Sequence, residues 1–186
     1  LWSLRAIPGF AVIRPADANE TAAAWLAILQ QRGPVGLVLT RQNVTTVTSS
    51  EVAMAGLHRG GYVLTGPEKP DAIVIATGSE VGIAVAAAEH LRSEGIGVRV
   101  VSMPCVEWFE QQDEEYRTSV LPRSVTARVA VEAGSTQGWW KYVGTDGAVV
   151  GIDHFGASAD HATLYREFGV TSERVAEALR ASLRSR

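Results

Sequence analysis

Short apolar runs alternate with amphipathic stretches along most of this chain. Runs rich in Val, Ile and Ala predict strands at 10–13, 35–39, 72–76, 98–102, 125–131 and 148–152. The stretches between most of them have the apolar period of a helix. Strands that alternate with helices predict an α/β fold with three layers, in which a mainly parallel sheet carries helices on both faces.

The first 41 residues predict a separate strand, helix, strand unit that belongs to a neighbouring α/β domain. Asp17 follows the first strand and Glu20 comes three residues later, which is a capping pattern for a helix that runs to about Gln31. Gly33-Pro34 then stops this helix before the second strand. One face of the helix is apolar, and its residues are Ala22, Trp25, Leu26 and Leu29.

Residues 42–59 have no apolar period and are rich in Thr, Ser and Val, which predicts a linker with one short helix before Gly60-Gly61. A second domain should follow over 60–186. Within it, Gly78-Ser79 opens a helix, 107–120 predicts an acidic helix, and Thr171 or Ser172 caps the last helix. The inward positions of the first and last of these helices are Val81, Val85, Ala88 and Leu91, and Val175, Ala178, Leu179 and Leu183.

Composition narrows the classes of partner. The 186 residues are 46% hydrophobic and 20% charged, as in ordinary globular proteins, and the net charge of -3 argues against a general grip on nucleic acid or anionic lipid. No apolar run is long enough to span a bilayer, and the lone Cys105 has no partner for an internal disulfide, so we expect a cytoplasmic protein. The absence of an initiating Met suggests a chain that begins inside a longer protein.

Arg41 is the main candidate for a binding residue. It lies in Thr40-Arg41-Gln42, directly after the apolar strand 35–39. Ligands of open α/β sheets bind at the ends of parallel strands, and the guanidinium fork suits a phosphate or carboxylate. The alternative role is that of a surface arginine paired with a carboxylate.

Several other features have structural interpretations that outweigh their chemical ones. Gly78-Ser79-Glu80 could hold an anion at a helix start, but Glu80 would repel phosphate, which favours a simple capped helix. The four histidines match no zinc-ligand spacing, and Cys105 is interpreted as a small buried residue rather than a nucleophile. Trp139-Trp140-Lys141-Tyr142 indicates a core or subunit contact, and the acidic run 110–115 a solvated helix face.

Seven sequence blocks, in this order and at these spacings, resemble the C-terminal part of a transketolase. They cover almost the whole chain: Arg14-Pro15-Ala16-Asp17, Leu39-Thr40-Arg41-Gln42-Asn43, Gly60-Gly61-Tyr62-Val63-Leu64, Ala76-Thr77-Gly78-Ser79-Glu80-Val81, Val100-Val101-Ser102-Met103-Pro104, 116–122 and 151–158.

This resemblance implies a function for the whole enzyme. Transketolases are homodimers that transfer a two-carbon ketol group between sugar phosphates in the pentose phosphate pathway, using thiamine diphosphate and Mg²⁺ or Ca²⁺. The resemblance implies that residues 1–41 are the tail of a pyrimidine-binding domain, 42–59 a linker and 60–186 the C-terminal domain. It also implies that Arg41 binds the substrate phosphate, with Thr40 at the position of the family's usual serine.

The same resemblance implies that the catalytic glutamate, the histidines of the substrate channel and the diphosphate-metal motif lie upstream of Leu1. We therefore expect no catalytic, cofactor-binding or metal residue in this chain, and no ketol transfer by the 186 residues alone. Gly144-Thr145-Asp146-Gly147 has the wrong spacing for the metal motif, and Asn19 and Asn43 are the only asparagines, so we expect a hairpin turn there.

A second hypothesis is a non-catalytic α/β regulatory or binding module. Related C-terminal domains occur in other thiamine-dependent enzymes, including pyruvate dehydrogenase subunits and deoxyxylulose phosphate synthase, so fold alone does not decide the substrate. Thr40-Arg41-Gln42 and the block 151–158 favour transketolase.

Overall fold

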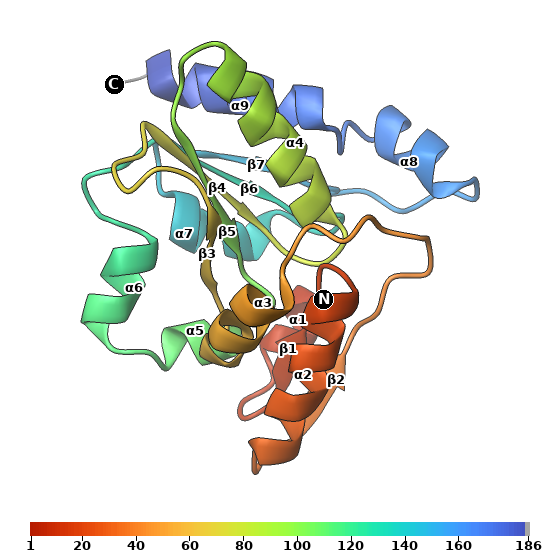
Figure 1. Ribbon diagram of the computed structural model, residues 1–186. Helices are drawn as coiled ribbons and strands as arrows, with labels where there is room; N and C mark the ends of the chain where they lie inside the picture. The colour runs from red at the N-terminus through yellow and green to blue at the C-terminus, as the bar shows by residue number, and fades with distance from the viewer. Residues whose placement is uncertain (185–186) are drawn as a thin grey trace.

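The computed structural model describes residues 1–184 and contains two sheets (Figure 1). The smaller sheet pairs β1 (Ala11–Ile13) with β2 (Val35–Leu37) in parallel, and α2 (Ala18–Gln30) connects them. The helix α1 (Trp2–Arg5) precedes β1. This arrangement confirms the strand, helix, strand unit expected at the start of the chain.

The larger sheet has five strands in the order β3-β5-β4-β6-β7. Only β3 runs antiparallel to its neighbour, which confirms the mainly parallel sheet. Residue bounds are β3 (Tyr62–Thr65), β4 (Ala72–Ala76), β5 (Val98–Ser102), β6 (Arg128–Val131) and β7 (Ala148–Val150).

Helices cover both faces of the larger sheet, as expected (Figure 1). Side chains of β4 alternate: Ala72, Val74 and Ala76 pack toward α4 (Glu80–Ser93) and α9 (Ser172–Arg184). Ile73 and Ile75 pack in a second core cluster on the other face. This alternation follows from the two-residue period of a strand and gives the three-layer fold two separate cores. The second cluster contains residues of α5 (Val106–Glu110), α6 (Glu114–Val120), the 3-10 helix η2 (Gln137–Trp139) and α7 (Trp140–Val143).

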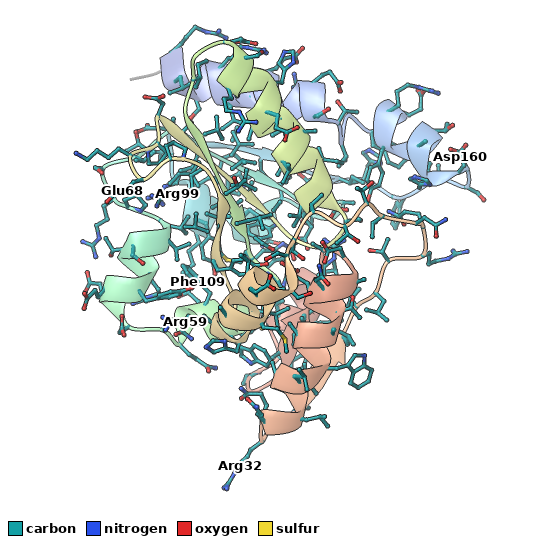
Figure 2. All side chains as sticks on the ribbon, in the orientation of Figure 1. Arg32, Arg59, Glu68, Arg99, Phe109 and Asp160 are labelled. Atoms are coloured by element: carbon teal, nitrogen blue, oxygen red, sulfur yellow. The ribbon has the colours of Figure 1, made fainter. Side chains whose placement is uncertain are left out.

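The apolar face of α2 is exposed. Trp25 is 54% and Leu29 77% exposed, whereas the buried face carries small alanines and one carboxylate: Glu20, Ala23, Ala24 and Ala27. Small side chains allow the helix to lie close to α3 (Ser50–Gly56) and to the 3-10 helix η1 (Leu57–Arg59), and the larger ones point outward. Figure 2 shows Arg32, just beyond the end of α2, pointing away from the rest of the chain.

Two expectations about local structure were wrong. The helix expected over 107–120 is broken into α5 and α6, because Asp113 accepts a hydrogen bond from the Tyr116 amide and starts a new helix. The turn 144–147 follows α7 rather than a strand, so it is not a hairpin, and β7 pairs in parallel with β6. The edge strand β3 was not predicted.

The linker region follows an extended path before its helix. Asp17 accepts hydrogen bonds from the amides of Val47 and Thr48 at 2.8 Å each, which fixes this segment against the start of α2. The expected short helix is α3 (Ser50–Gly56), and the 3-10 helix η1 (Leu57–Arg59) follows it. The remaining helix is α8 (His161–Glu167). Among residues 1–184, none of the helices has the length and apolar character needed to cross a membrane.

Candidate functional site

Arg41 lies just beyond the carboxyl end of β2. The pairing with β1 continues for one residue after the strand, where the Val38 amide donates to the Ile13 carbonyl at 2.8 Å. Arg41 itself is exposed, and within residues 1–184 its guanidinium has neither an ion pair nor a hydrogen bond. The alternative role, pairing with a surface carboxylate, is therefore not what the structure shows.

The residue next to Arg41 contacts the larger sheet's helices. The side-chain nitrogen of Gln42, Nε2, donates hydrogen bonds to Ser79 Oγ at 3.3 Å and to the Tyr165 hydroxyl at 3.4 Å. Both hydroxyls donate to Glu80 Oε1 at 2.6 Å, so the Glu80 carboxylate fixes their directions. Burial and the nearby Glu80 charge raise the pKa of Tyr165 to about 12, which keeps its hydroxyl protonated at neutral pH.

A cavity of about 510 Å³ lies beside this loop. Its walls come from the loop 42–47, from α4 and from α8, whose first turn is capped by Asp160 (Figure 2). Arg41 is not one of its lining residues, although its neighbour Gln42 is. The volume is that of a small-molecule site. A second cavity, of about 630 Å³, lies between α4 and the segments around Gly66 and Gly97.

A buried charge cluster joins the two sheets, and it consists of Arg5, Arg14, Glu80 and Glu132. Arg14 Nη1 lies 2.8 Å from Glu80 Oε2 and 3.0 Å from Glu132 Oε1. Arg5 pairs with the other oxygen of Glu132 at 3.1 Å, and the Trp139 indole donates to that oxygen at 2.8 Å. Both glutamates are fully buried, so each needs its positive partner.

The charge cluster and its neighbours lower the pKa of Glu80. Burial alone would raise the pKa of the carboxyl, but the Arg14 charge and the hydrogen bonds from Ser79, Tyr165 and the Ala133 amide hold it below its ordinary value. Glu80 is therefore ionised at neutral pH. Its Oε2 binds Arg14, and its Oε1 accepts hydrogen bonds from the hydroxyls that contact Gln42.

Glu20 is a buried carboxylate of a different kind. It accepts hydrogen bonds from Ser102 at 2.5 Å, from Tyr62 at 2.6 Å and from the Ala16 amide at 2.7 Å, and no cation contacts it among the described residues. Burial raises the pKa of Glu20 in spite of these hydrogen bonds. Neither Glu20 nor Glu132 was identified as a site residue from the sequence. For Glu132 a signal existed, since it directly follows an apolar strand, as Arg14 does.

The other candidates have structural roles. Ser79 does not cap α4 through its side chain, because its hydroxyl donates to Glu80 instead. Cys105 is fully buried, and burial raises the pKa of its thiol, as expected of a structural residue. Trp139 is fully buried in the core, whereas Trp140 is 49% exposed.

The described residues do not fit the metal of a thiamine enzyme. In the chain from 1 to 184 no group of three or more His, Cys, Asp or Glu side chains could hold a metal ion. Asn19 is already hydrogen-bonded to the Thr48 carbonyl and to Ser50, and Asp146 is exposed in its turn. No step of a reaction is therefore assigned to a cofactor bound by these residues.

Comparison with known proteins decides the family. The family model "Transketolase-like TK C-terminal domain" matches residues 60–171, which is more than half of the chain, and "Transketolase, pyrimidine binding domain" matches residues 1–46. This chain belongs to the transketolase family. The transketolases of Mycobacterium leprae and Mycobacterium tuberculosis are 57% and 55% identical to it over 96% and 98% of its length, and that of Bacillus subtilis is 50% identical over 97%. The chain spans only 26%, 27% and 28% of these three relatives.

Solved transketolases share the fold. The enzyme from Leishmania mexicana superposes with a TM-score of 0.90 at 41% identity, and covers 99% of this chain, which corresponds to 27% of that one. The Pichia stipitis transketolase in complex with sedoheptulose 7-phosphate gives 0.88 at 41% identity, with 99% and 26% covered. A structure titled "Split gene transketolase, inactive beta4 tetramer" gives 0.80 at 26% identity, with 97% of this chain and 60% of that chain covered.

Proposed function

We propose that this chain is the C-terminal part of a transketolase, including the end of its pyrimidine-binding domain, and that the full-length enzyme transfers a two-carbon ketol group between sugar phosphates. The family membership and the sugar phosphate bound to the Pichia stipitis relative support this proposal. In the full-length form of this protein, thiamine diphosphate with Mg²⁺ or Ca²⁺ would supply the carbanion chemistry. Residues of this chain would contribute substrate contacts and packing.

Arg41 is the proposed substrate-binding residue, and it would hold the phosphate end of the sugar. The observation that carries this role is its position: an exposed guanidinium, without a partner in the described part of the chain, at the carboxyl end of a parallel strand. A guanidinium free of carboxylates can offer parallel N–H donors to phosphate oxygens. Gln42 would hold the loop through Ser79 and Tyr165.

The proposed domain division is 1–41 for the tail of the pyrimidine-binding domain, 42–59 for the linker and 60–186 for the C-terminal domain. The ranges of the two family matches and the two separate sheets support it. The last two residues of the third range lie outside the described residues.

We propose a cytoplasmic homodimer for the full-length enzyme. The exposed apolar side chains of α2, Trp25, Leu26 and Leu29, offer a surface for contact with other parts of the assembly. The lone cysteine, buried and unpaired, is compatible with a reducing compartment.

The 186-residue chain by itself should not catalyse ketol transfer, since it spans about a quarter of its relatives and its described residues include no group of three or more His, Cys, Asp or Glu side chains that could hold a metal ion. The split-gene relative, whose title calls its tetramer inactive, supports this expectation. The experiment is a coupled ketol-transfer assay with thiamine diphosphate and Mg²⁺, run on the full-length protein and on the 186 residues. Turnover by the full-length protein alone is expected. Turnover by the short chain would refute the proposed inactivity, and no turnover by either would refute the activity.

A further inference from the structure

The five-stranded sheet has a position where its chain path reverses. From β4 the chain passes through α4 to β5 on one side, and from β5 it returns past β4 to β6 on the other side. The carboxyl ends of β4 and β6, at Ala76 and Val131, therefore border a crevice between diverging connections. Open α/β sheets bind their ligands at such a point.

In this chain the crevice contains the guanidinium of Arg14, a residue of the smaller sheet's unit. One carboxylate comes from the first turn of α4, where Glu80 contacts Arg14 at 2.8 Å. The second comes directly after β6, where Glu132 contacts it at 3.0 Å. Arg14 is 8% exposed and both glutamates are fully buried, so the contacts form away from solvent.

Gly78 lies directly against the guanidinium of Arg14. Gly78 has a φ of +61°, and a Cβ placed there would lie 2.8 Å from Arg14 Cζ, so only glycine leaves room for the group. Main-chain bonds hold the backbone of Arg14 beside it: the Gly78 amide donates to the Arg14 carbonyl at 3.0 Å, and the Arg14 amide donates to the Pro104 carbonyl at 2.9 Å.

The carboxylates are also fixed independently of Arg14. Glu80 accepts from Ser79, Tyr165 and the Ala133 amide, and Glu132 accepts from Trp139 and Arg5. A pocket that is held in shape by other contacts should retain its affinity when its ligand is removed.

We propose that this crevice is a guanidinium-binding site of the five-stranded sheet, and that Arg14 is its intramolecular ligand, which docks the strand β1 on the C-terminal domain. The site is distinct from the proposed phosphate contact of Arg41 and does not depend on ketol transfer. It assigns to the switch point a cation that both carboxylates contact through one nitrogen, Nη1 of Arg14, and that the neighbouring unit carries, in place of a soluble ligand.

The test is chemical rescue of an Arg14→Ala variant of the 186-residue chain with methylguanidinium. The variant should lose about 10 °C in Tm, because two buried carboxylates lose a shared partner. Methylguanidinium at millimolar concentrations should raise its Tm saturably by about 3 °C or more, whereas methylurea, a neutral molecule of similar shape, should not. The Tm of the unsubstituted chain should not rise.

The control is the double variant Arg14→Ala with Glu80→Gln, in which the site has lost one carboxylate and the rescue should disappear. A folded Arg14→Ala variant that methylguanidinium does not stabilise would overturn the proposal. So would an equal rise in the double variant or in the unsubstituted chain. If Arg14→Ala does not fold, recovery of its far-ultraviolet circular dichroism on refolding with methylguanidinium, and not with methylurea, is the expected result. Failure to recover with either would overturn the proposal.

Discussion

Arg14 Nη1 lies 2.8 Å from Glu80 Oε2 although the two residues are 66 positions apart in the sequence. The first directly follows the strand β1 and the second begins the helix α4, so this ion pair connects the smaller sheet to the larger one. Because Glu80 also binds the hydroxyls of Ser79 and Tyr165, the pair sets the position of the surface that meets Gln42. The loop that carries Arg41 is thus held by contacts to both sheets.

Gly78 allows Arg14 to approach the main chain, which predicts a large effect of Gly78→Ala. The added Cβ would lie 2.8 Å from Arg14 Cζ in a backbone with φ of +61°, so we expect a loss of about 2 to 4 kcal/mol in the free energy of unfolding. The measurement is urea unfolding of the 186-residue chain.

Gly95→Ala is the matched control for Gly78→Ala. Gly95 has a φ of +81° but no atom within 4 Å of an added Cβ, so its substitution should cost only the strain of the backbone, about 1 kcal/mol. Equal losses in the two variants would mean that the contact with Arg14 is unimportant.

The carboxyl of Glu80 should make stability depend on pH in the acid range. Its pKa in the folded chain lies below the ordinary 4.5, so the unfolded chain binds more protons there, and the stabilisation present above pH 4.5 is lost as the pH falls. Glu80→Gln should reduce the slope of unfolding free energy against pH below 4.5 by up to about 1.4 kcal/mol per pH unit. An unchanged slope in urea titrations at several pH values would contradict the ion pair.

Glu20 should make stability depend on pH in the opposite direction. Its pKa in the folded chain is raised by burial, so the folded state keeps a proton above pH 4.5, and stability falls as the pH rises from 4.5 through the folded pKa. Glu20→Gln should remove this decline while leaving the slope below pH 4.5 in place. The same titrations measure it, and a decline that persists unchanged in Glu20→Gln would show that Glu20 is not its source.

Much of the fold was predictable from the sequence, because each strand of the larger sheet except β3 is a short apolar run followed by a turn or a helix start. The edge strand β3 was missed since only Tyr62 and half-buried neighbours mark it. The sequence indicated an apolar face of α2 but not its exposure: Trp25 and Leu29 are exposed, whereas Ala23 and Ala27 pack near α3 and η1, where small side chains allow close approach.

For the candidate site, the sequence alone indicated a single residue. Arg41 was chosen because it lies just after the apolar run 35–39, and its role in substrate binding stays a proposal. The buried charge cluster was not identified, since it needs residues at 5, 14, 80 and 132 to meet, and sequence pattern gives no distance between strand ends that lie in different sheets. Glu80 was noted only as a group that would repel phosphate, and its partner Arg14 only as part of a sequence block.

Tyr165 should affect substrate phosphate binding through the Arg41 loop. Its hydroxyl lies between Glu80 and Gln42, so Tyr165→Phe removes one contact to the loop and leaves Glu80 with one donor fewer. In the full-length enzyme we expect KM for a phosphorylated sugar to rise about two- to fivefold with kcat nearly unchanged, the effect of one neutral hydrogen bond. Leu164→Ala is a control on the same helix, and an equal change in KM there would indicate a general loss of packing.

The central claim is that Arg41 holds the phosphate end of the sugar. The most direct measurement is the KM of the full-length enzyme for xylulose 5-phosphate and for xylulose, before and after Arg41→Ala. We expect KM for the phosphorylated sugar to rise about ten- to hundredfold, which corresponds to the loss of about 1.5 to 3 kcal/mol from charge-assisted hydrogen bonds, while KM for xylulose stays the same. An equal rise for both sugars, or none for either, would contradict the account.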